Sequence, residues 1–341
     1  MQPISLSPLP PSPLVSVLIP NYNYATYIGA AIKSVLDQTY QEFEIIVCDD
    51  GSTDNSIPVI QSYMNQDSRI YLIPKKNGGI ATALNAAFEV ASGHIISLLD
   101  ADDTWYPNKL EQVVQGFQNS NVGTVMHSLI VMNPHGNILK DKHPAKMPEG
   151  WLGPSFISDY RQKTFAPASG LSFHSDVAKE IFPIPSHFRT RVDRILWERA
   201  ILLAPVKQIP DVLAKYLLHT SNVTGFNRTV TVAEIDKFLK DLHEILQARA
   251  DFLAAKQGIS IPPETWWNTE AGRYYLARAL LQKEKLDWST IIDWSADIRP
   301  WLWIVLFRFL PRKWSIFALQ WWWGEGIAKR WARKFAAFTG I

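Results

Sequence analysis

The spacing of apolar residues changes repeatedly between residues 15 and 116. Short runs rich in Val, Ile and Leu alternate with segments whose apolar residues recur every three or four positions, a pattern typical of strands that alternate with helices. This alternation predicts an α/β fold in which helices cover both faces of a mostly parallel sheet. The expected strands are 15–20, 43–49, 70–73 and 94–99, and the expected helices are 27–38, a segment from Ser56, 80–91 and a segment opening at Pro107.

The pattern loosens after Gly116, where Pro and Gly become frequent. An apolar stripe from Thr231 predicts a long helix, and the rest of the chain has a helical pattern. The other expected elements are a strand at 122–132, loops around a binding face at 133–167, a helix at 192–203 and strands at 206–209 and 212–219. The pattern thus predicts a flexible tail at 1–12, an α/β domain at 13–222 and a helical region at 223–341.

Composition narrows the class of protein. The chain has 341 residues, 47% hydrophobic and 19% charged, which is ordinary for a globular protein of two units. A formal net charge of +2 provides no basic field for nucleic acid. The single cysteine, Cys48, excludes an intrachain disulfide and suits a reducing compartment. Residues 1–14 do not resemble a secretory signal, and the apolar run 301–307 is too short to span a bilayer, so we expect a cytoplasmic location.

Two acidic clusters follow expected strands. Asp49 and Asp50 come after the second strand, and Asp100, Asp102 and Asp103 come after the fourth. Because the carboxyl ends of parallel strands meet at one edge of a sheet, both clusters should face the same crevice. Each cluster by itself could simply cap the following helix. Together, the repulsion among three close carboxylates favours a hard cation, Mg²⁺ or Mn²⁺.

Several motifs stand in a fixed order along residues 13–222. They are the runs 17–23, 34–40 and 49–54, the run 77–79 with Asn85 and Gly93, and Asp100-Ala101-Asp102-Asp103. In order and spacing these motifs closely resemble those of family 2 glycosyltransferases, which have the Rossmann-like GT-A fold. The resemblance implies inversion at the anomeric carbon, a nucleotide-diphosphate (NDP) sugar donor with uracil or thymine as its base, and a divalent cation, Mn²⁺ or Mg²⁺, on the donor diphosphate.

The resemblance also implies roles at the nucleotide end of the site. Tyr22 would lie against the nucleobase, Pro20 and Asn21 would shape that pocket, and Asp50 would accept a hydrogen bond from the base ring. The motif also places Asn77 and Asn85 in the nucleotide-sugar site. For Asn77, as for Lys75, a contact with phosphate or sugar and a solvated loop position are both open.

At the metal end, the resemblance makes Asp102 the direct ligand of the cation. Asp100 would hold the ribose, the donor sugar or a metal-bound water, Ala101 lies between them, and the role of Asp103 stays open. His219 ends an expected strand in a Tyr-x-x-His-x-x-Asn pattern shared with relatives. His219 would complete the metal shell, or it would be a hydrogen-bonded structural histidine.

Inversion in a single displacement requires a base on the face opposite the leaving group. Asp193 is the candidate, because it opens an apolar-patterned helix where the family places its base. A carboxylate favoured by the helix dipole is the alternative. The family often carries Glu before this Asp, and Val192 stands there instead. Arg191 and Arg194 would keep Asp193 ionised or hold an anionic acceptor.

Half of the 14 tryptophans lie beyond residue 300, interleaved with Lys and Arg. This mixture is typical of a helix lying in a membrane interface, although packing against the protein or closure of a homodimer would use the same residues. We expect peripheral membrane contact through residues 299–340, on the inner face of the plasma membrane, and a glycan or lipid-linked acceptor.

Two other functions stay open. A non-catalytic sugar-nucleotide-binding or scaffold protein would not need Asp193, whereas a nucleotidyltransferase would need a glycine-rich basic loop after the first strand, where residues 21–24 stand instead. The Gln-x-x-Arg-Trp motif of chain-extending synthases is absent, because Ile327 replaces Gln before Arg330 and Trp331. We therefore expect transfer of one sugar at a time.

Overall fold

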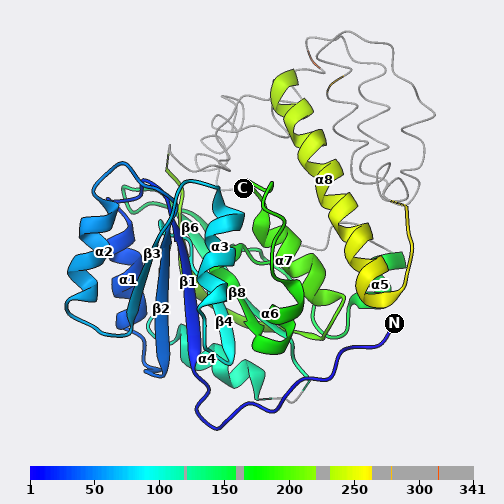
Figure 1. Cartoon of the computed structure of the whole chain (residues 1–341), viewed down its shortest axis with the longest axis horizontal. Helices are drawn as coiled ribbons and strands as arrows, with labels where there is room; N and C mark the ends of the chain where they lie inside the picture. Colours follow the sequence, from blue (N-terminus) through cyan, green and yellow to red (C-terminus); the bar gives the residue numbers. More distant parts are fainter. Residues whose placement is uncertain (119–120, 159–164, 220–230, 263–277, 279–313, 315–341) are drawn as a thin grey trace, which may run out of the picture. The chain divides into compact units, whose positions relative to one another are not determined.

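A computed structural model describes residues 1–118, 121–158, 165–219, 231–262, 278 and 314. The chain forms two compact units, Met1–Val223 and Thr224–Ile341. The described elements of the first unit, drawn in Figure 1, are β1 Val15–Asn21, α1 Ile28–Leu36, β2 Phe43–Asp49, α2 Ser56–Met64, β3 Ile70–Pro74, α3 Ile80–Glu89, β4 Ile95–Leu98, β5 Thr104–Trp105, α4 Lys109–Phe117, β6 Thr124–Met132, β7 Ile138–His143, α5 Gly153–Ser158, a 3₁₀ turn Ala168–Gly170, β8 Leu171–His174, α6 Ser175–Ile181, α7 Val192–Ile201 and β9 Val206–Leu217.

These strands form a single sheet in the order β3-β2-β1-β4-β8-β6-β9-β5, with β7 paired to β6. The half made of β3, β2, β1 and β4 is parallel, as the sequence predicts. The other half is mixed, because β8 runs antiparallel to both β4 and β6 while β6 and β9 are parallel. The α/β prediction is confirmed, and the sheet is less uniformly parallel than expected.

Three sequence expectations about local structure are wrong. The segments 206–209 and 212–219 form one strand, β9, whose register against β6 shifts after Ile209, where Pro210 has no N–H for the ladder. The stretch 133–167, expected as loops, contains β7 and α5. The helix expected to open at Pro107 begins at Lys109, and Pro107 lies in the preceding turn.

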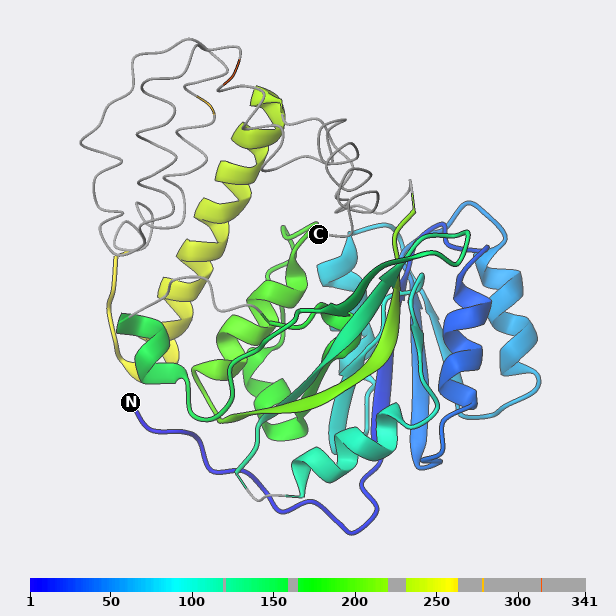
Figure 2. The same cartoon turned by 180° about the vertical axis from the view of Figure 1, so that it is seen from behind.

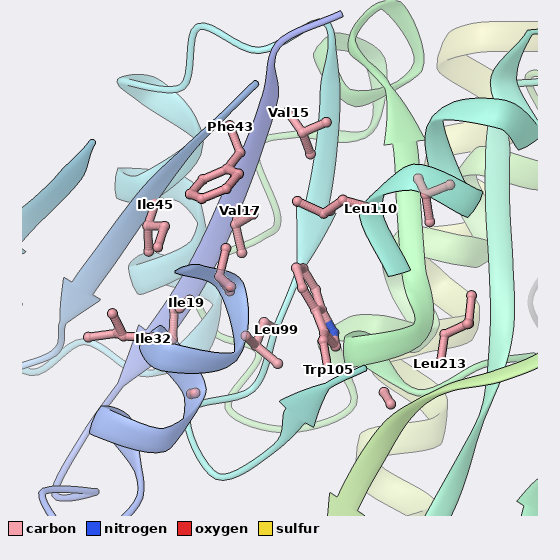
Figure 3. Packing of buried hydrophobic residues seen from close by; sticks show 14 of the residues in the cluster. Val15, Val17, Ile19, Ile32, Phe43, Ile45, Leu99, Trp105, Leu110 and Leu213 are labelled. Atoms are coloured by element: carbon pink, nitrogen blue, oxygen red, sulfur yellow. The ribbon is translucent and has the colours of Figure 1, made fainter. Parts of the chain in front are cut away.

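Helices cover both faces of the sheet. The helices α3, α6 and α7 lie in front of it in Figure 1, and α4 lies in front in the reverse view of Figure 2. The main core lies on the α1 and α4 side, where residues from β1, β2 and both helices are buried (Figure 3). Val15, Val17 and Ile19 all point into it, since alternate residues of a strand face one side of the sheet.

The parallel half places the acidic clusters at one edge. In the register of β1 and β2, Asn21 pairs with Asp49, and Leu18 of β1 pairs with Leu98 of β4. The three strands therefore end close together, and Asp50 and Asp100 follow directly after their tips. This edge is where the candidate site forms.

The first residues of the chain, expected as a loose tail, are hydrogen-bonded to the body of the first unit. The Ile4 N–H donates to the carbonyl oxygen of Leu203 at 2.8 Å, and the Ser7 N–H donates to Asp176 Oδ2 at 2.7 Å. The segment is thus bonded to α6 and to the turn that follows α7.

The second unit is described mainly through α8, Val232–Gln257. A capping box between Thr231 and Glu234 begins this helix, and Gly258, in the left-handed conformation, ends it. The predicted helix from Thr231 is confirmed. The helical pattern expected after α8 and the Trp-rich segment 299–340 lie outside the described residues, apart from Trp314. Within the described part of the chain, every helix is too short or too polar to cross a bilayer.

Candidate active site

The tips of β1 and β2 are joined by a hydrogen-bonded cluster around Asp49. Its carboxylate accepts from Asn21 Nδ2 at 2.7 Å, from the Ser52 N–H at 2.9 Å and from Ser52 Oγ at 2.6 Å. Gly51 has a φ of +79°, and a Cβ there would lie 2.8 Å from the backbone nitrogen of Asn77. Glycine is therefore required for the turn after β2 to approach the loop after β3.

Asp50, the residue expected to face the nucleobase, is 3% exposed and held by three donors. Its Oδ1 accepts from Lys75 Nζ at 2.6 Å and from the Gly78 N–H at 2.9 Å, and its Oδ2 accepts from the Gly79 N–H at 2.7 Å. Lys75 Nζ also donates to the Lys76 carbonyl oxygen and to Thr82 Oγ1. Lys75 is thus an internal support for Asp50, rather than the solvated residue or donor contact considered from sequence.

The other residues expected around the base lie beside this cluster. Pro20 pairs with Cys48 in the register of β1 and β2. Asn21 is 1% exposed, and its Oδ1 has no hydrogen-bond partner among the described residues. Tyr22 follows directly and is 45% exposed, so part of its side chain is available to a ligand. Because Tyr22 directly follows Asn21, an aromatic ring lies next to the hydrogen-bonded cluster at the tips of β1 and β2.

The two asparagines expected at the donor site have different surroundings. Asn77 is exposed in the loop after β3, and its Oδ1 lies 3.5 Å from Arg189 Nη1. Asn85 of α3 donates from Nδ2 to the Ile184 carbonyl oxygen and accepts on Oδ1 from the Ile184 N–H, both at 2.8 Å. Its amide group therefore joins α3 to the segment before α7, a bracing role that differs from the donor contact implied by the resemblance.

The cluster after β4 is anchored by its last carboxylate. Asp103 is 1% exposed, and it accepts from Ser169 Oγ at 2.6 Å and from the Leu217 N–H at 3.1 Å. Ser169 Oγ also accepts from the Asp100 N–H at 3.0 Å. Asp103, whose role was open, is thus a structural anchor, and it fixes the backbone that presents Asp100, Ala101 and Asp102.

His219, at the end of β9, lies beside Asp102. His219 Nε2 and Asp102 Oδ2 are 3.0 Å apart. The imidazole is stacked on the ring of Tyr27, with centroids 4.5 Å apart, and Tyr24 meets it edge-on at 5.8 Å. Two tyrosines from the loop after β1 therefore hold a histidine from β9 against the middle carboxylate of the acidic cluster.

Asp193 lies in the first turn of α7, after Arg191, whose φ of 56° is left-handed. This conformation is uncommon for arginine and is concentrated at functional sites. Burial raises the pKa of Asp193, while the Arg194 N–H and the charge of Arg191 counter that rise. A carboxylate with a raised pKa is a stronger base than an exposed one.

The carboxylates of β4 and α7 share one electrostatic environment. Burial raises the pKa of Asp100 to about 8, and the charges of Asp102 and Asp193 add to that rise. Burial also raises the pKa of Asp102, and His219 counters it. The charges of Asp102 and Asp193 thus both act on Asp100, and His219 lies beside Asp102.

These side chains have the chemistry of a hard divalent-cation site. Asp102 and His219 present an oxygen and a nitrogen 3.0 Å apart, and Asp100 adds a carboxylate that repels its neighbours. A cation would relieve that repulsion. In the described ranges, no group of three or more His, Cys, Asp or Glu side chains is arranged to hold a metal ion. A cation here would need ligands from a bound phosphate or water as well.

Sequence reasoning missed four residues at this edge. Ser169 supports Asp100 and Asp103, Tyr24 and Tyr27 hold His219, and Arg189 lies against the loop after β3. The two tyrosines follow Tyr22 closely and could have been noticed by their proximity to the first strand. Ser169 and Arg189 carry no local signal, because their partners lie far away in the chain.

The amino-acid sequence of this chain is similar to those of known glycosyltransferases. Residues 16–182 match the model for glycosyl transferase family 2. The chain is 37% identical over 212 residues to an uncharacterized glycosyltransferase of Nostoc sp., covering 61% of this chain and 66% of that protein. The chain belongs to glycosyltransferase family 2. The expected resemblance is confirmed.

One further relative and one solved structure are similar to this family 2 member. It is 38% identical over 135 residues, 39% of its length and 53% of the relative's, to the UDP-Glc:alpha-D-GlcNAc-diphosphoundecaprenol beta-1,3-glucosyltransferase of Escherichia coli. A mannosyltransferase of Pyrobaculum calidifontis, solved with GDP-Man and Mn²⁺, has a TM-score of 0.54 at 18% identity, covering 95% of this chain and 92% of that one. The sheet and its helices form the expected GT-A fold. The chain spans about two thirds of the Nostoc relative and about half of the E. coli one.

Proposed function

We propose that this family 2 member is an inverting glycosyltransferase that moves a single sugar from an NDP-sugar to an acceptor hydroxyl. One observation carries the proposal: the charge of Asp193 acts on Asp100, so a candidate base and the candidate diphosphate-binding carboxylates lie in one site. Asp50 and Tyr22 then bind the nucleobase at the neighbouring strand tips, and Asn77 and the backbone at Ala101 complete the donor site.

In this reaction the acceptor oxygen attacks the anomeric carbon on the face opposite the diphosphate. Asp193 takes the proton of the acceptor hydroxyl, and the bond from the anomeric carbon to the diphosphate oxygen breaks, so the nucleotide leaves with that electron pair. The raised pKa of Asp193 suits a base. Arg191 and Arg194 help to keep it ionised before the acceptor binds.

We assign the metal role to Asp102, with Asp100 and His219 as further candidate ligands. When bound, Mn²⁺ or Mg²⁺ stabilises the negative charge that collects on the departing diphosphate. The fit rests on the clustered carboxylates and on the imidazole beside Asp102. Mn²⁺ is present in the Pyrobaculum structure, which has the same fold.

The decisive experiment separates turnover from donor binding. Asp193→Asn should lower kcat by about 10³-fold, in the range of losing a general base, while the dissociation constant of the nucleotide changes less than about twofold. EDTA should abolish transfer, and Mn²⁺ or Mg²⁺ should restore it. Asp141→Asn, an exposed carboxyl of β7, is the matched control and should leave kcat unchanged.

Other results would point to other functions. Tight nucleotide-sugar binding without turnover in the wild-type chain would indicate a binding or scaffold protein. Formation of the NDP-sugar from a sugar phosphate and a nucleoside triphosphate would indicate a nucleotidyltransferase. Transfer that is indifferent to EDTA would remove the metal assignment.

We further propose a glycan or lipid-linked acceptor and peripheral contact with the inner face of the plasma membrane through residues 299–340. The printed name of the E. coli relative includes a diphosphoundecaprenol acceptor, which supports the lipid-linked class. The Trp and basic residues of 299–340 support the membrane contact. Failure of the full chain to co-sediment with anionic vesicles would contradict this contact.

A further inference from the structure

Arg189 packs against the turn that holds Asp50. A Cβ on Gly79 would lie 2.5 Å from Arg189 Cδ, 2.7 Å from Nη1 and 3.1 Å from Nε. The φ of Gly79 is +92°, so glycine suits this position for its backbone as well. The Gly79 N–H donates to Asp50 Oδ2, so a single peptide separates the guanidinium of Arg189 from the Asp50 carboxylate.

Arg189 differs from Lys75, the other cation near Asp50. The three donors of Lys75 have partners, namely Asp50 Oδ1, the Lys76 carbonyl oxygen and Thr82 Oγ1. Arg189 is exposed, and within the described ranges its only hydrogen bond is the long one, 3.5 Å, to Asn77 Oδ1. Because guanidinium has five N–H donors, Arg189 retains donors for a ligand.

Asp50 has a matching acceptor. Oδ1 already accepts from Lys75 and from the Gly78 N–H, which uses both of its lone pairs. Oδ2 accepts only from the Gly79 N–H among the described residues, so one lone pair is left. The site therefore offers one acceptor beside one charged donor.

This pair of groups discriminates among nucleobases. Uracil and thymine present a ring N–H flanked by carbonyl oxygens, which matches one acceptor beside one donor. Guanine adds an amino group beside its ring N–H, and a carboxylate satisfies both only when both of its oxygens are available. The occupied Oδ1 of Asp50 prevents that. Adenine and cytosine present an unprotonated ring nitrogen, which a carboxylate repels.

We infer that Arg189 is a specificity-determining residue that binds the imide edge of a uracil or thymine base together with Asp50. The inference rests on the proposed function, since it assigns the base of the NDP-sugar donor. The fold does not fix this base, because the Pyrobaculum mannosyltransferase with the same fold was solved with GDP-Man. In this chain the acceptor of Asp50 and the donors of Arg189 select the base.

The test measures binding of uridine, UMP, UDP, dTDP and GDP to the full chain by calorimetry, with Mn²⁺ present. Arg189→Ala should raise the dissociation constants of uridine, UMP and UDP by the same factor, roughly tenfold, because each ligand loses the same hydrogen bond from a charged donor. Wild-type protein should prefer UDP or dTDP to GDP by at least the same factor, and comparison of those two shows which pyrimidine is used.

A contact with phosphate gives a different result. If Arg189 binds the diphosphate, Arg189→Ala weakens UDP but leaves uridine unchanged, and the base assignment fails. Lys76→Ala removes a positive charge from the same exposed loop and serves as the matched control. An equal loss in that variant would mean that general electrostatic attraction, rather than a base contact, is responsible.

The outcomes also separate this inference from the proposed function. Wild-type protein that binds none of the nucleotides contradicts the proposed function. Wild-type protein that prefers GDP, or that binds uridine as tightly after Arg189→Ala, overturns the role of Arg189 and leaves glycosyl transfer standing. An unchanged melting temperature in Arg189→Ala, expected for an exposed side chain, confirms that the variant is folded.

Discussion

The two acidic clusters at the edge of the sheet differ in how their charges are compensated. Asp49, the last residue of β2, and Asp50, which follows it, each accept three hydrogen bonds, and Lys75 pairs directly with Asp50. Asp100, after β4, accepts none from the described residues, and its neighbours are the carboxylates of Asp102 and Asp193. The charge of Asp50 in the first cluster is compensated by Lys75 without a ligand, and the charges of the second cluster are not compensated.

This difference suits two separate tasks. A nucleobase is neutral, so the residues that bind it can be fixed in advance by internal hydrogen bonds. A diphosphate arrives with its cation, and a site for that cation must concentrate negative charge before binding. Burial raises the pKa values of Asp100 and Asp102, and the charges of Asp102 and Asp193 raise the pKa of Asp100 further.

The largest expected effect concerns the compensated cluster, Asp49 and Asp50. Asp50→Asn should lower the free energy of unfolding by about 3 kcal/mol, because Lys75 loses its charge partner and the new amide turns one N–H toward donors. Urea denaturation measures the loss. The control is Asp37→Asn, which breaks a 2.7 Å pair with Lys33 whose side chains are 52% and 63% exposed, and it should cost less than about 0.5 kcal/mol.

A loss in Asp50→Asn no larger than in Asp37→Asn would mean that burial adds nothing to the Lys75 pair. The two clusters would then differ only in the number of their partners, and the account of the first cluster as pre-organised would fail.

In the uncompensated cluster, Asp100 and Asp102, removal of a carboxylate should stabilise the protein. Asp100→Asn should raise the free energy of unfolding of the metal-free protein by about 2 kcal/mol at pH 7, a value reduced for the partial exposure of this side chain. The pKa of Asp100 is about 8 in the folded protein, above the value of an unfolded aspartate, so the folded state binds more protons between these two values. The contribution of Asp100 to the free energy of unfolding therefore falls as pH rises from about 4 to 8.

Denaturation in EDTA at several pH values tests this sign. Asp100→Asn should remove this fall, and its stability advantage over the wild type should vanish below about pH 4. With saturating Mn²⁺, the wild type should be the more stable protein. Asp141→Asn, at an exposed site of β7, should follow the wild-type profile. A stability difference between Asp100→Asn and wild type that stays constant over this interval would contradict the description of the cluster.

Sequence periodicity predicted the parallel half of the fold well, because each of its strands is a buried apolar run followed by an amphipathic helix. It did not predict β5, β7 or β8, which have two, six and four residues. The segments β5 and β8 contain too few alternations to distinguish a strand from a loop, and β7 is mostly exposed and lacks a buried apolar face. β8 also inserts between β4 and β6 and reverses the local direction of the sheet, which no local pattern specifies.

For the site, the sequence could predict the residues that follow strand tips, because parallel strands bring those tips together. Asp50, Asp100 and Asp102 are of this kind. It could not predict partners set by the tertiary fold. Ser169 bonds to Asp103 across 66 residues, and Arg189 meets Asn77 across 112. Asn85 shows the converse, since a motif residue suggested a ligand contact and the fold uses its amide to hold Ile184.

The smallest expected effect concerns Tyr27, which connects the two halves of the site. Tyr27 belongs to the loop after β1, yet its ring stacks on His219 at 4.5 Å with an interplanar angle of 18°. Ring stacking of this kind contributes about 1 kcal/mol, so Tyr27→Leu should weaken Mn²⁺ binding about fivefold by releasing His219 from Asp102, as measured by titration of free Mn²⁺.

Tyr27→Phe keeps the ring and should stay within about twofold of wild type. Tyr71→Leu, on an exposed tyrosine of β3, is the control. Equal weakening by the Leu and Phe variants would assign the effect to the hydroxyl, and unchanged affinity in both would show that the donor half does not position the metal half through this ring.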